Sequence, residues 1–456
     1  MRLCLDDGRQ SAHGRPAVAE AQARGRHRPQ GVGQGLTLTR QPESAIYRRG
    51  KKPRPRENRM RRVLLISLAA VVAFFGFGSN GIAQTVKVGA VVPLTGRYAA
   101  LGGQVKTGYE IAVQQINAAG GVTVGGKKLQ IEMTMLDDES DPTKTVARLE
   151  TFATQGVVAY LGGAGSDLHA AAASIGDKNK IPYLGIAFAL HSIHKQGLRY
   201  LFSPFPKSPD LTNETFVFLD ALIPAAHRPR KVALFLERTD WGKEMGGLWE
   251  SAAKKHAYQI AASGEYAPGS KDFSDLILKA KSAGAEAVLA LPSPPDGMTI
   301  VKQMKELDFN AKVNMFIRAA DPPVWSQNLS KDGDYVLLTP GWHFAAGYPK
   351  VAELNEAHQK LFNRPSDPLV GPSYACLQIL ADAVTRAKTL DRDKLRDAIA
   401  ATKMTTVVGP VQFRSDGTGE VKVFVLQWLK GKQELVWPKE FATAPFGYPA
   451  PAFSQR

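Results

Sequence analysis

The sequence predicts an α/β protein of two similar lobes, each built on a parallel sheet. Short apolar runs that are typical of buried strands alternate with amphipathic helical segments. The alternation starts again after the stretch SPFPKS at residues 203–208. Strands that alternate with helices of this length indicate parallel sheets with right-handed crossovers. The 373 residues from 84 to 456 are also a length that usually forms two domains.

The first alternation fills residues 86–186. In the amphipathic segment Gln104–Ala118, Ile111 and Ile116 share one face, and two following glycines provide a C-terminal stop. Asp141 is suited to cap a helix that begins with Pro142, because proline favours the first helical turn. The predicted strands are Val86–Val92, Leu129–Leu136, Val157–Leu161 and Pro182–Ile186, and a further helix is predicted at Leu168–Asp177.

The second alternation fills residues 231–307. Its predicted strands are Lys231–Leu236 and Glu286–Leu291, and its predicted helices are Lys243–His256, a segment from Phe273 to Gly284, and Thr299–Leu307. The last third of the chain adds a predicted helix at Tyr374–Lys388 and a predicted strand pair, Val411–Phe413 with Val421–Trp428.

Residues 60–83 have the pattern of a secretory signal peptide. Arg61 and Arg62 precede the apolar run Val63–Phe75, and Gly81-Ile82-Ala83 offers small residues for cleavage before Gln84. A membrane anchor is the alternative, although a spanning helix requires roughly 20 apolar residues. We expect a cleaved signal peptide and a periplasmic product.

Residues 1–59 predict a disordered basic extension that precedes a mis-called start, with Met60 as the true start. They are rich in Arg, Gly, Pro and Gln and show no sustained apolar periodicity. A basic arm that binds nucleic acid is the alternative. Of the chain's 58 Lys/Arg and 42 Asp/Glu, residues 1–83 hold 16 and 5, which leaves 42 and 37, a net charge of +5. We therefore expect no nucleic-acid partner. Cys376, the single cysteine after residue 83, forms no internal disulfide.

A glycine-rich turn marks the candidate binding site. In open parallel sheets, ligands bind beyond the carboxyl ends of the strands. The turn Gly162-Gly163-Ala164-Gly165-Ser166 joins a predicted strand to a predicted helix, whose free N–H groups suit a carboxylate or phosphate. A dinucleotide site and a plain tight turn are the alternatives. A dinucleotide site requires an acidic residue at the end of the next strand, and IPYLGIAF contains none.

Six segments follow one another in the order that one known family has: VKVGAVVPLTGRYAALGGQVKTGYEIAVQQINAAGGV, LDDESDP, the glycine-rich turn, KVALFLERTDWGKEM, KDFSDLI and VVGPVQFRSDG. With them, the sequence resembles the periplasmic leucine/isoleucine/valine-binding protein family of ABC importers over essentially residues 85–430. The resemblance implies a type I periplasmic binding fold, in which two Rossmann-like lobes on a three-stranded hinge close over a small ligand. It implies an N-terminal lobe at 85–205 plus 340–410 and a C-terminal lobe at 206–339 plus 411–456.

The resemblance also implies ligand contacts. Gly165 and Ser166 match the family's carboxylate site, Ala187 matches an assisting backbone group, and Trp241 matches an aromatic ring of the second lobe. Phe188 and Tyr374 are further candidates for an apolar pocket wall. As structural alternatives, Ser166 is a plain helix cap, Trp241 and Tyr374 are packing residues, and Arg318 is a structural ion pair.

Departures from the family pattern put the ligand class in question. Ala189 stands where the family's amino-acid binders have Thr, and Leu101, with Tyr98 nearby, stands where an aromatic residue is expected. In MFIRAADPP, either Asp321 meets the ligand's ammonium or Arg318 occupies that place and accepts a second anionic group. The altered residues favour an aromatic or aliphatic acid without an amino group over a branched-chain amino acid.

The sequence does not favour an enzyme. The pair His191 and His194 lacks companion ligands for a metal, and we expect it in a surface loop. Ser166, Asp167 and His169 are adjacent in sequence, whereas a catalytic triad is recognised by its geometry. We expect a monomeric solute-binding protein without metal or cofactor that delivers a small carboxylated solute to a membrane permease and its ATPase. A ligand-sensing receptor module of the same fold is the alternative.

Overall fold

The computed structural model describes residues 84–456. The predicted basic extension and signal peptide lie outside these residues. Among residues 84–456, no helix combines the length and the apolar character that a membrane crossing requires.

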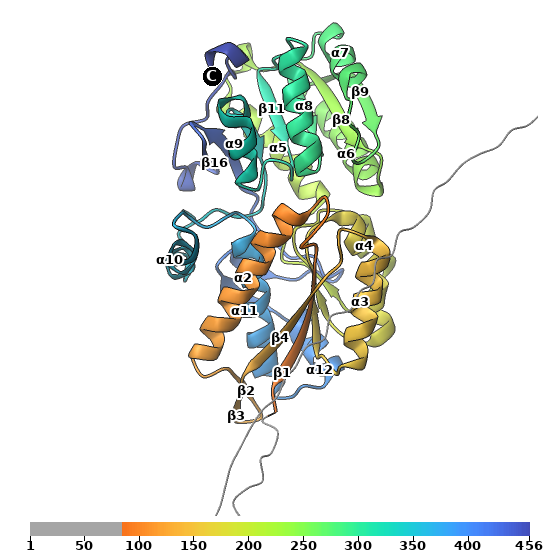
Figure 1. Ribbon diagram of the computed structural model, residues 1–456, viewed down its shortest axis with the longest axis vertical. Helices are drawn as coiled ribbons and strands as arrows, with labels where there is room; N and C mark the ends of the chain where they lie inside the picture. The colour runs from red at the N-terminus through yellow and green to blue at the C-terminus, as the bar shows by residue number, and fades with distance from the viewer. Residues whose placement is uncertain (1–83) are drawn as a thin grey trace, which may run out of the picture. The chain divides into compact units, whose positions relative to one another are not determined.

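The first lobe is built on a five-stranded parallel sheet in the order β4-β1-β5-β6-β7. Helices α2 (Ala99–Ala118) and α11 (Val370–Ala387) cover one face, and α3 (Pro142–Thr154) and α4 (Ser166–Asn179) cover the other (Figure 1). The strands are β1 (Val86–Val92), β4 (Ile131–Asp137), β5 (Ala159–Leu161), β6 (Tyr183–Leu184) and β7 (Leu201–Phe202). A short hairpin of β2 (Val122–Val124) and β3 (Lys127–Leu129) follows α2.

The second lobe is built on a seven-stranded sheet in the order β16-β15-β12-β11-β10-β8-β9. The strands from β12 to β9 in this order run parallel, and β15 and β16 run antiparallel at one edge. The strands are β8 (Lys231–Glu237), β9 (Gln259–Tyr266), β10 (Ala287–Ala290), β11 (Val313–Phe316), β12 (Val336–Leu338), β15 (Val425–Leu429) and β16 (Lys432–Trp437). The helices are α5 (Ser208–Leu222), α6 (Asp240–Lys255), α7 (Ser274–Ser282), α8 (Pro294–Glu306) and α9 (Val324–Leu329).

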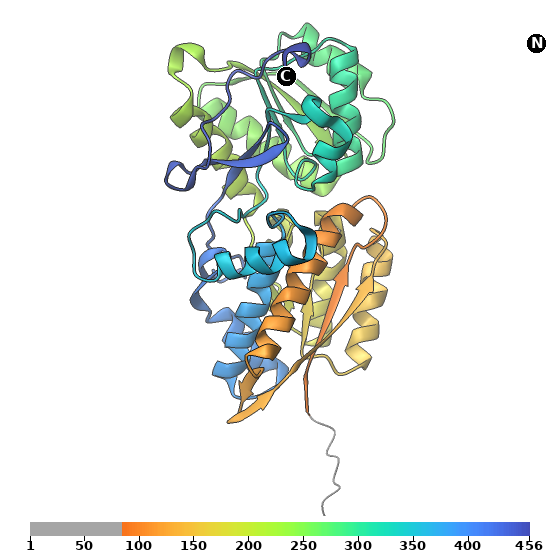
Figure 2. The same ribbon diagram turned by 60° about the vertical axis from the view of Figure 1, so that its left-hand side comes forward.

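The chain crosses between the two lobes three times, as Figure 2 allows the reader to follow. The first crossing leads from β7 to α5, and the second leads from β12 to α10 (Val351–Phe362) and α11. The third leads from the hairpin of β13 (Lys403–Thr406) and β14 (Gly409–Gln412), after α12 (Arg392–Ala400), to β15. The predicted α/β fold with two parallel sheets is confirmed.

The helix ends follow from local sequence. Asp141 accepts hydrogen bonds from the N–H groups of Thr143 (2.7 Å) and Lys144 (3.1 Å), so it caps α3 as predicted. Thr239 caps α6 by accepting from the N–H of Gly242 at 3.1 Å. These caps fix where each helix begins, and therefore where the loop before it points.

One predicted strand pairing is wrong, and three predicted helices begin at least four residues earlier than expected. The helices predicted from Gln104 and Thr299 begin at Ala99 and Pro294. Val411–Phe413 does not pair with Val421–Trp428, because β14 pairs with β13 and β15 pairs with β16. Phe413 instead forms a bridge with Gly419, which precedes the predicted second strand, and Thr418 forms a bridge with Ser203 beside the first sheet. The helix predicted from Tyr374 begins at Val370, where Pro372 is tolerated in the first turn.

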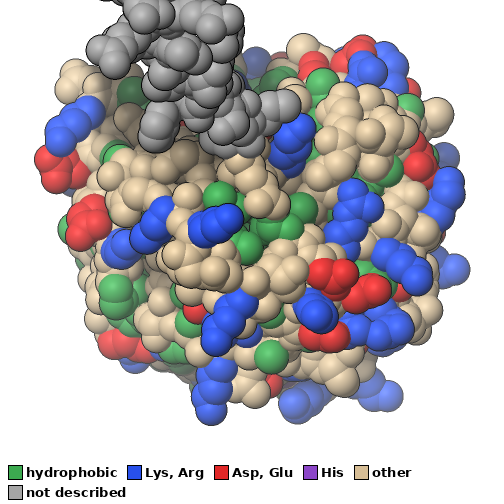
Figure 3. All heavy atoms as spheres, turned by 90° about the horizontal axis from the view of Figure 1, so that it is seen from below, with side chains coloured by type: hydrophobic (Ala, Val, Ile, Leu, Met, Phe, Trp, Pro, Cys, Tyr) green, Lys and Arg blue, Asp and Glu red, His purple; other side chains and the backbone are tan. Residues whose placement is uncertain are grey.

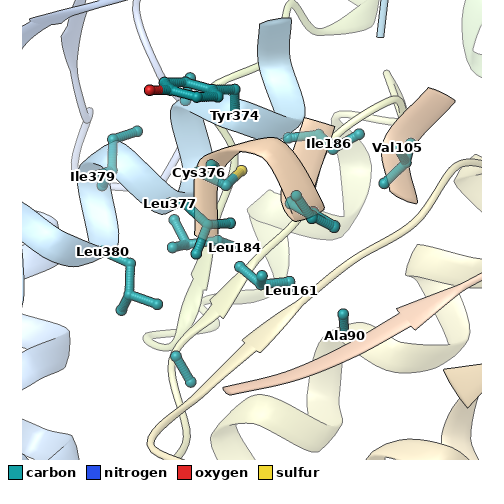
Figure 4. Close-up of a cluster of buried hydrophobic side chains, with 14 of the residues drawn as sticks. Ala90, Val105, Leu161, Leu184, Ile186, Tyr374, Cys376, Leu377, Ile379 and Leu380 are labelled. Carbon is teal, nitrogen blue, oxygen red and sulfur yellow. The ribbon is translucent and has the colours of Figure 1, made fainter. Parts of the chain in front are cut away.

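The core of the first lobe is a closely packed cluster of buried apolar side chains. Figure 4 shows Leu161, Leu184, Leu377 and Cys376 in one cluster of buried side chains between the sheet and α11. Cys376 is fully buried, as a small apolar side chain would be. On the part of the surface that Figure 3 shows, Lys/Arg and Asp/Glu side chains are interspersed.

Candidate functional site

A cavity with a free space of about 390 Å³ lies where the carboxyl ends of the strands of both lobes meet. Its lining from the first lobe is Leu101, Ser166, Ala187, Phe188, Ala189 and Leu369. Its lining from the crossings and the second lobe is Phe205, Leu211, Trp241, Ile317, Arg318, Asp321 and Thr339. This space includes solvent that is open to the cavity, and the walls are mostly apolar.

The cavity brings together eight of the predicted ligand contacts. The three exceptions are Gly165, Tyr98 and Tyr374. Gly165 lies beside the cavity and precedes α4 with φ of +116°, a conformation that favours glycine. Tyr98 lies behind Arg318, to which its hydroxyl is bonded at 3.1 Å. Tyr374 belongs to the core of the first lobe, where its hydroxyl donates to Gln115 at 2.6 Å (Figure 4).

Ser166 stands at the first position of α4 and presents a hydroxyl and N–H groups to the cavity. Its Oγ accepts from the N–H groups of Ala189 (3.3 Å) and Leu190 (3.4 Å). No acceptor for the hydroxyl hydrogen of Ser166 is found among residues 84–456, so that hydrogen is available to a ligand. The first N–H groups of a helix also lack partners within the helix and favour an anion. The site therefore suits a carboxylate.

The loop that carries Ala187, Phe188 and Ala189 is fixed from two sides. Gly165 donates its N–H to Ala187 O at 3.1 Å from the side of α4. From the first crossing, Lys207 Nζ donates to Phe188 O at 2.8 Å, and the N–H and hydroxyl of Ser208 donate to Ala189 O, each at 2.8 Å. The backbone that faces the ligand is thereby held rigid before any ligand arrives.

Lys207 and Ser208, which the sequence analysis did not identify, support the loop that lines the cavity. Lys207 is 1% exposed, and its Nζ lies 3.4 Å from the centre of the Phe188 ring. Burial lowers the pKa of Lys207 well below its usual range. The sequence offered one indication of this role, which is the lysine in the stretch SPFPKS at the boundary of the lobes. A charged side chain there is either exposed or held by hydrogen bonds.

The second lobe contributes Trp241 and Arg318 to the opposite wall. Trp241 lies in the first turn of α6, and the Arg318 guanidinium lies 4.9 Å from the centre of its ring. Arg318 Nη2 donates to Glu237 Oε2 at 3.0 Å and to Leu291 O at 2.7 Å. The positive charge of Arg318 is therefore already paired with a carboxylate of its own lobe.

Four charged groups alternate in sign along one side of the cavity. Asp167 is bonded to Arg97, Arg97 Nη1 lies 3.8 Å from Glu237 Oε1, and Glu237 is bonded to Arg318. Tyr98 connects the same groups, because its hydroxyl donates to Asp167 at 3.0 Å and accepts from Arg318. Since Asp167 and Arg97 belong to the first lobe and the other two to the second, this network joins the lobes without net charge.

Asp321 lies on the cavity wall as a buried carboxylate without a hydrogen-bond donor among the described residues. Its side chain is 4% exposed, and Oδ1 has no partner. Burial raises the pKa of the Asp321 carboxyl well above its usual range, and the charge of Arg318 opposes this only in part. Both Arg318 and Asp321 line the cavity, so the two sequence alternatives are not mutually exclusive.

The loop of Asp321 is held by glutamines from both sides. Asp321 O accepts from Gln104 Nε2 of the first lobe at 3.3 Å and from Gln433 Nε2 of the second at 2.9 Å. Gln104 in turn accepts from the N–H of Leu369 at 3.0 Å. The position of Asp321 therefore depends on contact between the lobes.

Thr339 and Leu369 are further lining residues that the sequence analysis did not identify. Thr339 directly follows β12, so the rule that places ligands beyond strand ends would have found it if that three-residue strand had been predicted. Its hydroxyl and Trp241 Nε1 are buried without a hydrogen-bond partner among residues 84–456. Both are available to polar atoms of a ligand.

The expected surface position of the His191 and His194 pair is wrong for one member. His194 is 2% exposed, and its Nδ1 lies 3.0 Å from Asp416 O, while His191 Nε2 lies 3.3 Å from Asp416 Oδ2. Within residues 84–456, no group of three or more His, Cys, Asp or Glu side chains is arranged to hold a metal ion.

Comparisons with known proteins identify the family of the chain. A family model described as periplasmic binding protein matches residues 85–433. The leucine-, isoleucine-, valine-, threonine- and alanine-binding protein of Pseudomonas aeruginosa is 24% identical over 370 residues, which cover 80% of this chain and 96% of that protein.

Two solved structures share the fold at low sequence identity. The branched-chain amino acid transporter substrate-binding protein LivJ of Streptococcus pneumoniae, in complex with isoleucine, has a TM-score of 0.67 and 22% identity, over 78% of this chain and 100% of that chain. A solute-binding protein of an ABC transporter from R. palustris, in complex with benzoate, has a TM-score of 0.67 and 18% identity, over 81% and 97%.

Proposed function

Because the chain belongs to the periplasmic binding protein family, we propose that it is the substrate-binding protein of an ABC importer. It captures a small carboxylated solute between its lobes and delivers it to a permease. The cavity between the strand ends supports this proposal, since it has one carboxylate-binding end at Ser166 and mostly apolar walls.

The preferred solute is a branched-chain amino acid or a related amino acid. The observation that carries this choice is the unpaired Asp321 carboxylate beside an Arg318 that is already paired with Glu237, both within the described residues. A buried carboxylate without a partner is costly, and a ligand ammonium would supply the missing charge. The ligand carboxylate would then contact Ser166, and its side chain would contact Leu101, Phe205 and Ile317.

An acid without an amino group is the second candidate. Four of the five N–H groups of Arg318 are bonded, to Pro292, Leu291, Glu237 and Tyr98, and one hydrogen on Nη1 remains for a ligand oxygen. Ala189 also lacks the hydroxyl of the family's amino-acid binders. With Asp321 protonated, the site would accept such an acid.

Closure of the lobes is the mechanism. A ligand stabilises the closed state only through contacts that the open state does not offer, so it must contact both lobes. Ser166 belongs to the first lobe, and Trp241 and Asp321 belong to the second. We further propose that the protein acts as a monomer, and that it reaches the periplasm through cleavage before Gln84.

A matched pair of ligands tests the proposal. Leucine and 4-methylpentanoate, which is leucine without its amino group, are added to the protein in a thermal-shift assay, with isoleucine, valine and benzoate in parallel. We expect leucine or one of its branched-chain relatives to raise the melting temperature, because a ligand that binds only the folded state stabilises it. The deaminated analogue should have a much smaller effect. A response to 4-methylpentanoate or benzoate alone would establish the second candidate, and no response to any of them would refute both.

A further inference from the structure

A second hollow lies on the first lobe beside the third crossing. We call it the hinge groove: it is bordered by η1 (Ser192–Gln196), β7, α12 and residues 413–417, and its free space is about 1010 Å³. None of its lining residues lines the ligand cavity. The contacts described above leave this groove without a role.

The rim of the hinge groove carries more positive than negative charge. Its basic residues are Lys195, Arg199, Arg396 and Arg414, and its one acidic residue is Asp416. Asp416 is already engaged, because Oδ1 accepts from the hydroxyl of Thr418 at 2.7 Å and from its N–H at 3.0 Å, and Oδ2 lies 3.3 Å from His191 Nε2. The four basic residues therefore outnumber the one acidic residue of the groove lining.

Two of the basic side chains have no ion-pair partner among residues 84–456. Arg414 lies 3.5 Å from Glu420, and Arg396 lies 2.7 Å from Asp397. Within the same described part of the chain, neither Lys195 nor Arg199 has a carboxylate within ion-pair distance. Their charges are thus free to meet an anion.

Buried polar atoms and an apolar floor accompany the basic rim. Nε2 of His194 and Nε of Arg396 are buried without a hydrogen-bond partner among the described residues. The floor includes Leu198, Leu201 and Phe413. A ligand that contacts both the basic rim and the apolar floor needs an anionic group and an apolar part.

We propose that the hinge groove binds a small organic anion, with its charged group against Lys195 and Arg199 and its apolar part on Leu198, Leu201 and Phe413. The groove joins the body of the first lobe to the crossing, because Ser203 N donates to Gly417 O at 2.9 Å and Gly419 N donates to Ser203 O at 2.8 Å. The bound anion therefore contacts the moving connection between the lobes. This inference is independent of the solute that the ligand cavity takes.

Naphthalene-2-sulfonate is a suitable probe, since it combines one negative charge with an apolar ring system. Isothermal titration into the wild-type protein should show saturable binding. The double variant Lys195→Gln/Arg199→Gln should bind the probe about five- to thirtyfold more weakly, which corresponds to two exposed ion pairs. Both side chains are exposed and leave no described partner stranded, so the variant should fold normally.

A control double variant, Lys271→Gln/Lys302→Gln, makes the same change in net charge on the second lobe. Both lysines are exposed and lie outside the groove. The control should keep the wild-type affinity within about twofold, and inorganic sulfate should bind far more weakly than the probe because it cannot use the apolar floor. Absence of saturable binding, an unchanged affinity in the groove variant, or an equal loss in the control would each overturn the proposal.

Discussion

Replacement of Asp321 by Asn tests the charge complementarity of the ligand cavity. Asn keeps the size of the side chain and removes its capacity for negative charge. In the ligand-free protein the carboxylate has no hydrogen-bond donor among the described residues, so the replacement breaks no bond that the structure shows. Asp321 O continues to accept from Gln104 and Gln433, because both contacts involve the backbone. We therefore expect the free energy of unfolding without ligand to stay within about 1 kcal/mol of wild type.

Leucine binding should respond strongly to the same change. Removal of one partner of a buried ion pair costs about 3–5 kcal/mol, which corresponds to a loss of affinity of roughly a hundredfold to several thousandfold. The affinity for 4-methylpentanoate should stay equal or increase. The neutral amide of the Asp321→Asn variant does not repel the carboxylate of this ligand. Titration calorimetry with both ligands measures the two effects on the same protein.

Asp308→Asn is the matched control. This carboxylate is fully exposed and its residue has φ of 49°, a conformation that Asn adopts readily. The control should bind leucine as wild type does. Leucine affinity in Asp321→Asn within about threefold of wild type would refute the assignment of the ligand ammonium to Asp321, because the loss expected for a broken buried ion pair is far larger.

Three further predictions follow from the site and the leader. Ser166→Ala should weaken solute binding about ten- to a hundredfold with little change in melting temperature, since a hydrogen bond to a charged group contributes about 1.5–3 kcal/mol; unchanged affinity by titration calorimetry would move the carboxylate site elsewhere. Because burial raises the pKa of Asp321, the folded ligand-free protein holds this proton more tightly than the unfolded chain, and the stability from this group should fall as the pH rises above about 4. A ligand ammonium requires the ionised carboxylate, so leucine affinity should rise with pH up to the raised pKa, and binding should release a proton. Calorimetry in buffers of different ionisation enthalpy measures this proton release. A leucine affinity that does not change with pH would contradict the prediction. Expression from Met60 should yield a periplasmic product that begins at Gln84, and N-terminal sequencing that finds residues 63–75 intact would instead support a membrane anchor.

The strands and strand ends of the ligand site were predictable because their signals are local. The apolar run before Gly162 and the helix predicted after it indicated where a loop would face a ligand, and Ser166 and Trp241 both line the cavity. The three-residue strand Val336–Leu338 is too short to show a period, so Thr339 was not identified. Local patterns thus predicted most of the strand ends that form the cavity and missed the short strand β12.

The pairing of charges was beyond the sequence because it depends on residues far apart in the chain. Arg318 is paired with Glu237, which lies 81 positions earlier, and no local pattern connects the two. Tyr374 shows the same limit for helices: its position on α11 is compatible with either the core or the cavity, and packing against α2 places it in the core. The ligand class therefore depends on contacts that only the folded chain reveals.

The Asp321 side chain lies outside the charge network that contains Arg318, and this has a consequence for how such a protein could change its ligand. The alternating network of Arg97, Asp167, Glu237 and Arg318 joins the lobes by itself, whereas the Asp321 carboxylate takes part in none of those contacts. If Asp321 meets the ligand's ammonium as we propose, a substitution of its side chain should change which head group is accepted without disturbing the alignment of the lobes. Duplicated copies of the gene would need a single codon change there to explore a new nutrient, while the parent framework stayed intact.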